Sequence, residues 1–442
     1  MLNSLVHRVS TLVVEKSGAY RQAIAGWLIF FSVLVYTISI VYPGAILYLC
    51  GALYWLALFC VFPDVQGRSK KQVRFILICS LPGILLSIYQ LNADPFQKAL
   101  VSNAGIITLL MVVGLFGLSS HSEPKSNINK AFGSGPKFLI STYANVHFIG
   151  AIINYAAVII FGDRLHKIQP LNIHQATLLS RAFASAGFWS PLFVTMAVAS
   201  TYSPNFDFIA VLPLGLAVAM SGFLYTMIEY RIKGRLDNFL GLGTSVQSMM
   251  LPIGVAIVIG VLVYLFPTAS IINIVILTAL AFGVFHFSTK KYAIVNYVQK
   301  RLPKHHNEIA LFLSAGALNA SLMGVIYCFS DQIDLLRLSP MLCVAFMASA
   351  MALNMIGVHP LISITLFAGI VDIENTKPNM LAFTLFSTWA ICSALGPLSG
   401  QNIGLASRYS RDSMAIAKNN ILFSLTLFSI CSMFIFLLCD RL

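Results

Sequence analysis

The sequence predicts an all-α polytopic membrane protein with about 11 transmembrane helices plus two re-entrant hairpins, arranged as two inverted repeats. Three observations lead to this fold class. Of the 442 residues, 58% are hydrophobic and only 10% are charged, whereas a soluble protein carries roughly 25% charged residues. Apolar runs long enough to cross a bilayer recur along the chain, and they are continuous rather than alternating, which favours helices over strands. The basic residues gather in short loops between the runs.

Apolar length and loop composition set the expected spans. They lie near 23–42, 44–62, 73–92, 98–118, 137–161, 206–227, 248–266, 270–287, 309–329, 340–370 and 418–440. The first of these runs is long enough to span and follows a polar, basic stretch, so we expect a membrane helix there rather than a cleaved signal peptide.

Two further apolar segments, 176–203 and 380–408, are interrupted in the middle. The first contains Gly187-Phe188-Trp189-Ser190-Pro191, and the second contains Gly396-Pro397-Leu398-Ser399-Gly400-Gln401-Asn402. Such residues free backbone polar groups, which the membrane tolerates only where the backbone is buried in protein or lines a wet cavity. We interpret both segments as re-entrant hairpins.

The distribution of Lys and Arg gives an orientation. With the N-terminus in the cytoplasm and both hairpins re-entrant, most of the 28 basic residues fall on the cytoplasmic side, as the positive-inside rule requires. The C-terminus is then outside, and the basic residues on that side are Lys98, Arg164, Lys167, Arg337 and Arg441. The net charge of +13 is therefore a topology signal rather than a nucleic-acid-binding surface.

A weak internal repeat supports the same layout. Residues 185–200 can be aligned with 393–407 with one gap, and each half then consists of a span, a span, a hairpin and a span. This divides the chain into N-terminal scaffold helices (1–97), a first repeat (98–227), a connecting region (228–308) and a second repeat (309–442). The two halves enter the membrane from opposite sides. Within the connecting region, 229–247 predicts a basic amphipathic surface helix, followed by two connecting helices.

Arg181 is the one basic residue expected well inside an apolar segment, and no Asp or Glu is expected there. A charge at the bilayer centre costs at least roughly 2.5–3.5 kcal/mol, so such a residue indicates a functional site. A buried cation without a carboxylate partner points to an anionic ligand, which its planar guanidinium would grip. The alternative is that Arg181 extends to the outer membrane surface.

An inverted repeat with interrupted helices predicts a transporter whose site lies at the membrane midplane. There, helix N-termini would attract an anion, Trp189 would cover its apolar part, and Ser185, Ser190, Ser399, Gln401 and Asn402 would donate hydrogen bonds. The alternative is that these small polar residues only allow close helix packing. Four polar residues on two of the expected spans could take part in ion coupling: His147 and Asn154 on one face of 137–161, and Asn354 and His359 on 340–370, where Pro360 predicts a helix break. The histidines could carry protons or could be structural groups that satisfy the freed backbone.

The sequence shows no motif for a disulfide framework, a metal site, ATP binding or hydrolytic catalysis. The eight cysteines fall in apolar segments without ligand spacing, which predicts buried small side chains and neither a disulfide framework nor a metal site. Walker A, His-Glu-x-x-His and Gly-x-Ser-x-Gly motifs are absent from the sequence. We therefore expect no catalytic residues and no cofactor beyond Na⁺ as a coupling ion.

The two inverted halves and the segments Trp189-Ser190-Pro191 and Gly396-Pro397-Leu398-Ser399-Gly400 resemble the ion transporter superfamily of secondary carriers, which includes the divalent-anion/sodium symporters. The resemblance is architectural and covers roughly residues 98–440. The Ser-Asn-Thr tip motif of the dicarboxylate branch is missing from both segments. Membership would imply an elevator-like movement and, often, a homodimer.

The sequence thus predicts a secondary active transporter of a small, organic anion in the cytoplasmic (inner) membrane, coupled to H⁺ or Na⁺. Its partners would be that anion and the lipid bilayer, with no nucleic acid. Three alternatives stay open: a cation/proton antiporter of the same architecture, an intramembrane enzyme acting on a lipid-linked substrate, and a membrane subunit without transport activity of its own.

Overall fold

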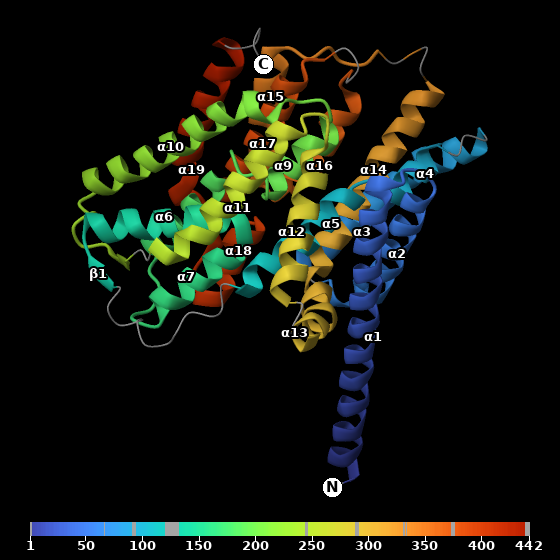
Figure 1. Cartoon of the computed structure of the whole chain (residues 1–442), viewed down its shortest axis with the longest axis horizontal. Helices are drawn as coiled ribbons and strands as arrows, with labels where there is room; N and C mark the ends of the chain where they lie inside the picture. Colours follow the sequence, from blue (N-terminus) through green and yellow to red (C-terminus); the bar gives the residue numbers. More distant parts are fainter. Residues whose placement is uncertain are drawn as a thin grey trace. The chain divides into compact units, whose positions relative to one another are not determined.

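The computed structural model describes residues 2–65, 67–90, 94–119, 132–243, 246–287, 291–329, 332, 334–372 and 376–437. Most of these residues lie in helices (Figure 1). Among the described residues, eight helical stretches are long and apolar enough to cross a membrane: Gly18–Val41, Ile46–Asp64, Ser69–Tyr89, Asp94–Phe116, Phe208–Ile232, Tyr292–Cys328, Pro378–Tyr409 and Ser413–Leu437. The prediction of an all-α, multi-pass membrane protein is confirmed at this level.

The chain divides into two compact units, Met1–Val112 with Ala279–Asp334 and Val113–Thr278 with Leu335–Leu442. In the first unit, α1 packs against α2, and α14 packs against α3 and α4. Its helices, two of which continue into the second unit, are α1 (Leu2–Val41), α2 (Ile46–Val61), α3 (Gly67–Tyr89), α4 (Asp94–Val101), α5 (Ala104–Ser119), α12 (Ile271–Phe287), α13 (Lys291–Asn296) and α14 (His306–Cys328). Short 3₁₀ and π turns at Phe62–Asp64, Tyr297–Arg301 and Leu302–His305 complete it.

The second unit contains all the candidate site residues. Its helices are α6 (Pro136–Ile153), α7 (Ala156–His166), α8 (Ile173–Ala186), α9 (Val194–Tyr202), α10 (Phe208–Ile232), α11 (Val246–Leu265), α15 (Pro340–Met355), α16 (Pro360–Ile370), α17 (Pro378–Leu395), α18 (Gly400–Tyr409) and α19 (Ser413–Leu437). Strands β1 (Phe132–Ser134) and β2 (Leu240–Leu242) form an antiparallel pair. We call the end of this unit that holds β1 and β2 the strand end, and the opposite end, where α9 stops and α17 starts, the far end.

Helices α6 and α7 form a hairpin that enters from the strand end. Thr142 of α6 accepts a hydrogen bond from the Leu242 backbone at 2.7 Å, so α6 starts beside β2. The chain turns at Asn154, whose φ of 53° lies in the left-handed region. Helix α7 then returns to the start of α8, whose Gln175 donates to the Leu240 carbonyl at 2.9 Å. The expected span over 137–161 is therefore wrong: this segment is broken and folds back.

Helices α15 and α16 form the second hairpin, which enters from the far end. Two backbone hydrogen bonds join the chain before α15 to the chain after α16. The N–H of Leu336 donates to the Ile370 carbonyl, and the Leu336 carbonyl accepts from the N–H of Asp372. The break before Pro360 was predicted, and Gly357 turns the chain there with a φ of 102°. The expected single span over 340–370 is wrong for the same reason as in the first hairpin.

Helices α8 and α9 form one broken helix, in which α8 and the break run along α10 and α9 packs against α17. Tyr230 of α10 donates to the His174 carbonyl at 2.5 Å, and further along α10 a Cβ added to Gly222 or Gly215 would meet Ser185 or the Phe188 carbonyl. These contacts move steadily down α10 as α8 and the break advance, and α9 ends at Tyr202, just before α10 starts at Phe208. The chain therefore continues in one direction through the break. The break at 187–193 lies where it was predicted, but the expected hairpin over 176–203 is wrong.

Helices α17 and α18 form a second broken helix that runs in the opposite direction. Ser203, just after α9, donates to the Pro378 carbonyl at 2.8 Å and so places the start of α17 at the far end. Helix α18 lies beside α7, where Arg408 and Asp163 are 2.7 Å apart (Figure 1). The break at 396–399 was predicted, whereas the expected hairpin over 380–408 was not correct.

Positive φ values explain which segments fold back. The two hairpin tips contain Asn154 and Gly357 in that region, and each reverses the chain. In the two broken helices, Gly187 and Gly396 keep φ values of −66° and −70°, and the chain continues. An interruption rich in Gly and Pro therefore shows where a helix stops and leaves open which way the chain goes next.

The amphipathic helix expected over 229–247 is not formed. Helix α10 continues to Ile232 and ends at Gly234, which has a φ of 60°. Residues 240–242 then form β2, whose Gly241 packs against the carbonyl of Phe138. The basic residues of this segment therefore flank a helix end and a strand.

Candidate functional site

Arg181 is fully buried and paired with a carboxylate. Its NH1 lies 2.5 Å from Glu229 Oε2, its Nε donates to Asn420 Oδ1 at 2.9 Å, and its NH2 donates to the Asn419 carbonyl at 2.6 Å. The rings of Phe423 and Tyr225 lie 5.1 and 5.5 Å from the guanidinium carbon.

Two expectations for Arg181 are therefore wrong. It does not extend to the surface, because its exposed fraction is 0%. It also has an acidic partner, because α10 continues past the expected end of its apolar run and carries Glu229 inward against α8. Each of the three guanidinium nitrogens has a protein acceptor, so the arrangement stabilises the packing of α8 against α10 and α19.

Ser180 is the centre of a buried polar cluster where α8 crosses the second break. Its hydroxyl donates to Asn402 Oδ1 at 2.8 Å and accepts from Gln401 Nε2 at 2.8 Å. Asn402 Nδ2 donates to the carbonyls of Ala394 and Gly396, which the break leaves without helical partners. Of the two predicted ligand-binding residues, Asn402 thus satisfies the interrupted backbone between α17 and α18, and Gln401 ties the break to Ser180 of α8.

The remaining residues of the second break have similar roles. Ser399 caps α18 by accepting from the Asn402 backbone at 3.3 Å. At the neighbouring hairpin tip, His359 Nδ1 caps α16 by accepting from the Leu361 backbone at 3.2 Å. Asn354 Nδ2 donates to the Val358 carbonyl at 3.3 Å, and its Oδ1 lies beside Gly396. The structure brings Asn354, Ser399, Gln401 and Asn402 to this one break.

The first break is tied to the tip of the first hairpin. Ser190 donates to the Ala151 carbonyl at 2.5 Å and accepts from the Leu192 backbone at 3.3 Å. Asn154 Nδ2 donates to the Leu192 carbonyl at 3.4 Å. These bonds satisfy backbone groups that neither helix can use, and they fix the hairpin tip against the break.

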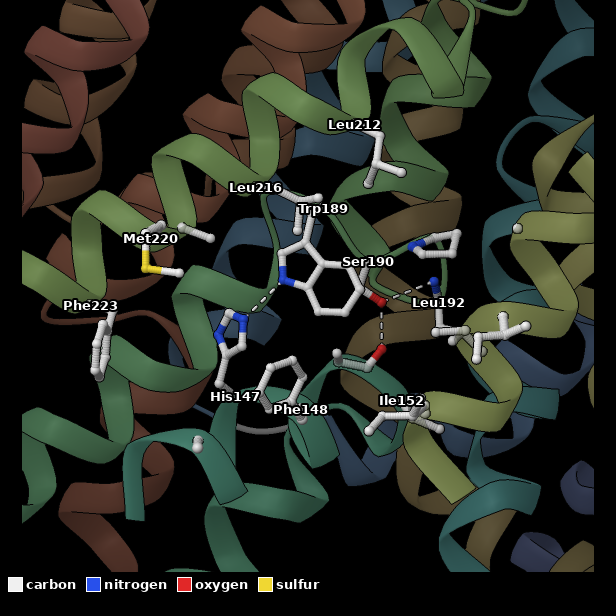
Figure 2. Close-up of a pocket in the computed structure, with 18 of the residues that line it drawn as sticks. His147, Phe148, Ile152, Trp189, Ser190, Leu192, Leu212, Leu216, Met220 and Phe223 are labelled. Atoms are coloured by element: carbon white, nitrogen blue, oxygen red, sulfur yellow. Dashed lines mark hydrogen bonds between the residues drawn. The ribbon is translucent and has the colours of Figure 1, made fainter. Parts of the chain in front are cut away.

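A cavity of about 550 Å³ lies beside the first break, between α6, α10 and α11. Figure 2 shows the ring of Trp189 in its centre, with His147 and Phe148 from α6 on one side and Leu212, Leu216 and Met220 from α10 on the other. Aliphatic and aromatic side chains form nearly the whole lining. The polar side chains that reach it are those of Tyr143, His147, Trp189 and Ser190.

His147 and Trp189 form a hydrogen-bonded pair in the cavity wall (Figure 2). The indole Nε1 donates to His147 Nε2 at 3.0 Å, and His147 Nδ1 lies 3.1 Å from the Ala182 carbonyl. Because an indole only donates, Nε2 must accept, and the ring proton is then on Nδ1 and directed at the carbonyl. His147 is therefore neutral in this arrangement, and both of its nitrogens are occupied.

Ser185 and Tyr143 form another hydrogen-bonded pair, in which the phenol donates to the Ser185 hydroxyl at 2.8 Å.

Sequence reasoning missed Tyr143, Glu229 and Asn420. The signal that could have identified the last is Asn419-Asn420, two adjacent amides in an otherwise apolar span. No sequence pattern assigned Tyr143 to the cavity rather than to ordinary helix packing.

A second ion pair lies at the strand end, at an exposed position. Arg408 contacts both carboxylate oxygens of Asp163 at 2.7 Å, and Tyr409 donates to Asp163 Oδ1 at 2.9 Å. The hydrogen bond from Arg408 lowers the pKa of Asp163 below its usual value, and Tyr409 adds to this effect. The pair holds α18 to α7.

Within the described ranges, no three His, Cys, Asp or Glu side chains lie close enough together to hold a metal ion. Neither a scan against models of protein families nor a search of curated proteins found a match to this chain. Arguments about function therefore depend on the geometry of the hairpins, the breaks and the cavity.

Proposed function

We propose that this protein is a secondary active transporter of a small organic solute in the cytoplasmic membrane, coupled to H⁺ or Na⁺. The observation that supports this most is that two hairpins from opposite ends of the second unit meet two interrupted helices. Interrupted backbone at membrane depth leaves polar groups that need partners, and transporters use such breaks to build a site between repeats of opposite orientation.

The repeats we propose differ in detail from those expected from the sequence. Each consists of a hairpin, a broken helix and a long helix: α6–α7, α8/α9 and α10 in the first, and α15–α16, α17/α18 and α19 in the second. They cover 136–232 and 340–437, and they correspond element by element while running in opposite directions. A homodimer and an elevator-like movement remain implications of the resemblance to the ion transporter superfamily.

The hypothesis that the transported solute is an anion was based mainly on an unpaired Arg181. Because Glu229 neutralises this charge, anion transport now depends only on the partial positive charge at helix starts near the breaks. The same finding gives one support to the cation/proton antiporter alternative, since Glu229 is a mostly buried carboxylate, with 11% of its side chain exposed. Exchange of Na⁺ for H⁺ in vesicles, independent of organic solutes, would favour that alternative.

Transport can be tested with purified protein in proteoliposomes, using currents on a solid-supported membrane while H⁺ or Na⁺ gradients and sets of anionic and neutral solutes are varied. We expect saturable, gradient-dependent flux for one set. Ser190→Ala, which removes one of the two links between the first break and the hairpin tip, should lower the flux at least about tenfold at a stability cost of about 1 kcal/mol. Ser221→Ala is the matched control, because this hydroxyl bonds only within an exposed face of α10.

Two outcomes would contradict the proposal. One is the lack of gradient-driven flux for both solute sets by protein that is folded and correctly inserted. The other is turnover of a lipid-linked substrate by the purified chain, which would favour the enzyme alternative.

A further inference from the structure

We infer that the cavity beside Trp189 is a binding site for a neutral, hydrophobic small molecule that enters from the bilayer. The inference deepens the proposed transport function by naming a substrate class, and it rests on that function only for the step after binding. Three features of the cavity support it: its size, the state of its polar groups and the composition of its mouth.

The size fits a drug-sized ligand. Pockets that enclose such molecules measure roughly 300–1,000 Å³ and are lined mainly by hydrophobic and aromatic groups. This cavity, of about 550 Å³, presents Phe148, Trp189 and Phe223 as flat aromatic surfaces (Figure 2). A ring system could stack on these surfaces without displacing any hydrogen bond.

The polar groups of the lining are already satisfied by the protein. Trp189 donates to His147, His147 contacts the Ala182 carbonyl, and Ser190 donates to the Ala151 carbonyl. Tyr143 donates to Ser185, and the lining has no Asp, Glu, Lys or Arg side chain. An ion placed here would lose its hydration without gaining a partner, which is strongly unfavourable. The cavity therefore selects against charge.

The mouth of the cavity is apolar and opens between α6, α10 and α11. Met220 and Ile257 line the cavity and are nevertheless 57% and 60% exposed, and Ile253 beside them is 49% exposed. Because α10, which carries Met220, is long and apolar enough to cross a membrane, and because Ile253–Leu265 of α11 is an apolar helix beside it, these side chains would face acyl chains rather than water. A ligand that partitions into the bilayer can enter by this route, whereas a strongly hydrated solute would have to cross lipid.

The corresponding position in the second proposed repeat shows that such a cavity is not a general result of the fold. A groove beside α15 and α19, lined by Met351, Leu395 and Phe428, measures only about 270 Å³. Its lining lacks an equivalent of the indole–imidazole pair and comes from α15, α17 and α19, without a counterpart of α11 among the described residues. Of these two cavities, the one beside Trp189 is the larger.

A glycine in the wall allows a direct test. A Cβ added to Gly260 would meet no atom within 4 Å, so Gly260→Leu should fill part of the cavity without a backbone clash. Gly254 on the same helix is equally free of neighbours and does not line the cavity, which makes Gly254→Leu the matched control. The probe is 9-anthracenemethanol, with 9-anthracenecarboxylate as its anionic analogue of similar shape.

Binding would be measured in phosphatidylcholine nanodiscs by energy transfer from the protein's tryptophans to the anthracene, without any ion gradient. We expect saturable transfer with the neutral probe for the wild type and Gly254→Leu, and a Kd raised at least about tenfold for Gly260→Leu, equivalent to about 1.4 kcal/mol. The carboxylate should show no saturable component. If Gly260→Leu proves unstable, Ala256→Leu fills the same wall and gives a second measurement.

Three results would overturn the inference. Equal affinity for Gly260→Leu and the wild type would place the probe elsewhere, and equal or tighter binding of the carboxylate would contradict selection against charge. Non-saturable transfer that is the same in all variants would show that lipid chains or a second copy of the chain fill the space. Saturable binding without solute flux would contradict the transport proposal alone, whereas flux unaffected by Gly260→Leu would contradict this site alone.

Discussion

The paired state of Arg181 makes a quantitative prediction about stability. Breaking a buried ion pair by removing one partner costs about 3–5 kcal/mol, because the remaining charge is left without compensation in a low-dielectric interior. Glu229→Gln would leave a fully buried guanidinium with two neutral acceptors and two aromatic rings. We therefore expect a loss of about 4 kcal/mol of unfolding free energy for this variant.

Removing Arg181 instead of Glu229 should lower the unfolding free energy by less. After Arg181→Met, Glu229 keeps the Lys233 ammonium at 2.5 Å and lies at the edge of the buried region, with 11% of its side chain exposed. We expect a loss of about 2 kcal/mol, and the double variant should lose clearly less than the sum of the two, with a coupling of about 2 kcal/mol. Lys233→Gln is the control, because an exposed pair of this kind contributes about 0.5 kcal/mol or less.

The assay is reversible unfolding in mixed micelles of SDS and a mild detergent, followed by tryptophan fluorescence. Two findings would refute the reasoning: single substitutions within about 0.5 kcal/mol of the wild type, or losses that add without coupling. If Arg181→Met instead abolished stabilisation by an added anion while the unfolding free energy stayed unchanged, Arg181 would be a ligand-binding residue and its pairing with Glu229 incidental.

Two further predictions concern stability in the second unit. Gly215→Ala would place a Cβ 2.0 Å from the Phe188 carbonyl, so we expect a loss of about 1–3 kcal/mol in the same assay, against no loss for Gly254→Ala. The pKa of Asp163 is lowered by Arg408, so this ion pair stabilises the protein at neutral pH and its contribution is lost as the pH falls through the lowered pKa. Asp163→Asn should therefore cost about 1 kcal/mol or less near neutral pH, and its melting temperature should converge with that of the wild type on acidification. A difference that persists or grows in acid would refute this assignment.

The sequence allowed the positions of the helix breaks to be predicted, because Gly, Pro and Ser cluster within a few residues at each of them. A single proline is a weaker signal, since Pro82 and Pro213 lie inside continuous helices. Both predicted breaks are present, at 187–193 and 396–399. Whether the chain turns back or continues at an interruption could not be predicted, since it depends on single φ angles, positive at Asn154 in the first hairpin tip and negative at Gly187 and Gly396 in the two breaks. Asn adopts positive φ more readily than most residues but does not require it, so its identity alone did not show that α6 turns back.

The candidate site was predictable in part for a similar reason. Trp189 and Ser190 were singled out because they lie at a predicted break, and His147 because it could carry a proton, and the three do lie together at the cavity. The pairing of Arg181 with Glu229 joins residues 48 positions apart and depends on where α10 ends. An apolar run marks the part of a helix inside lipid, while the helix itself continues for another turn and can return a carboxylate to the protein interior.

The exchange of hairpins and broken helices leaves the proposed membrane orientation intact. A hairpin does not cross the membrane, whereas a broken helix does. The expected order in each repeat was a span followed by a hairpin, and the observed order is a hairpin followed by a broken helix. The change moves only the short connection between the two elements to the other side of the membrane. In the first repeat this moves Arg164 and Lys167 to the cytoplasmic side, and in the second it moves Lys377 to the outside. The side proposed to be cytoplasmic thus gains two basic residues and loses one. This strengthens the excess of Lys and Arg on that side, on which the orientation was based. Charge counting could not distinguish the two arrangements clearly, because both satisfy it. The contacts of α8 and the first break with α10, and those that place the two ends of the α17/α18 helix, decide between them.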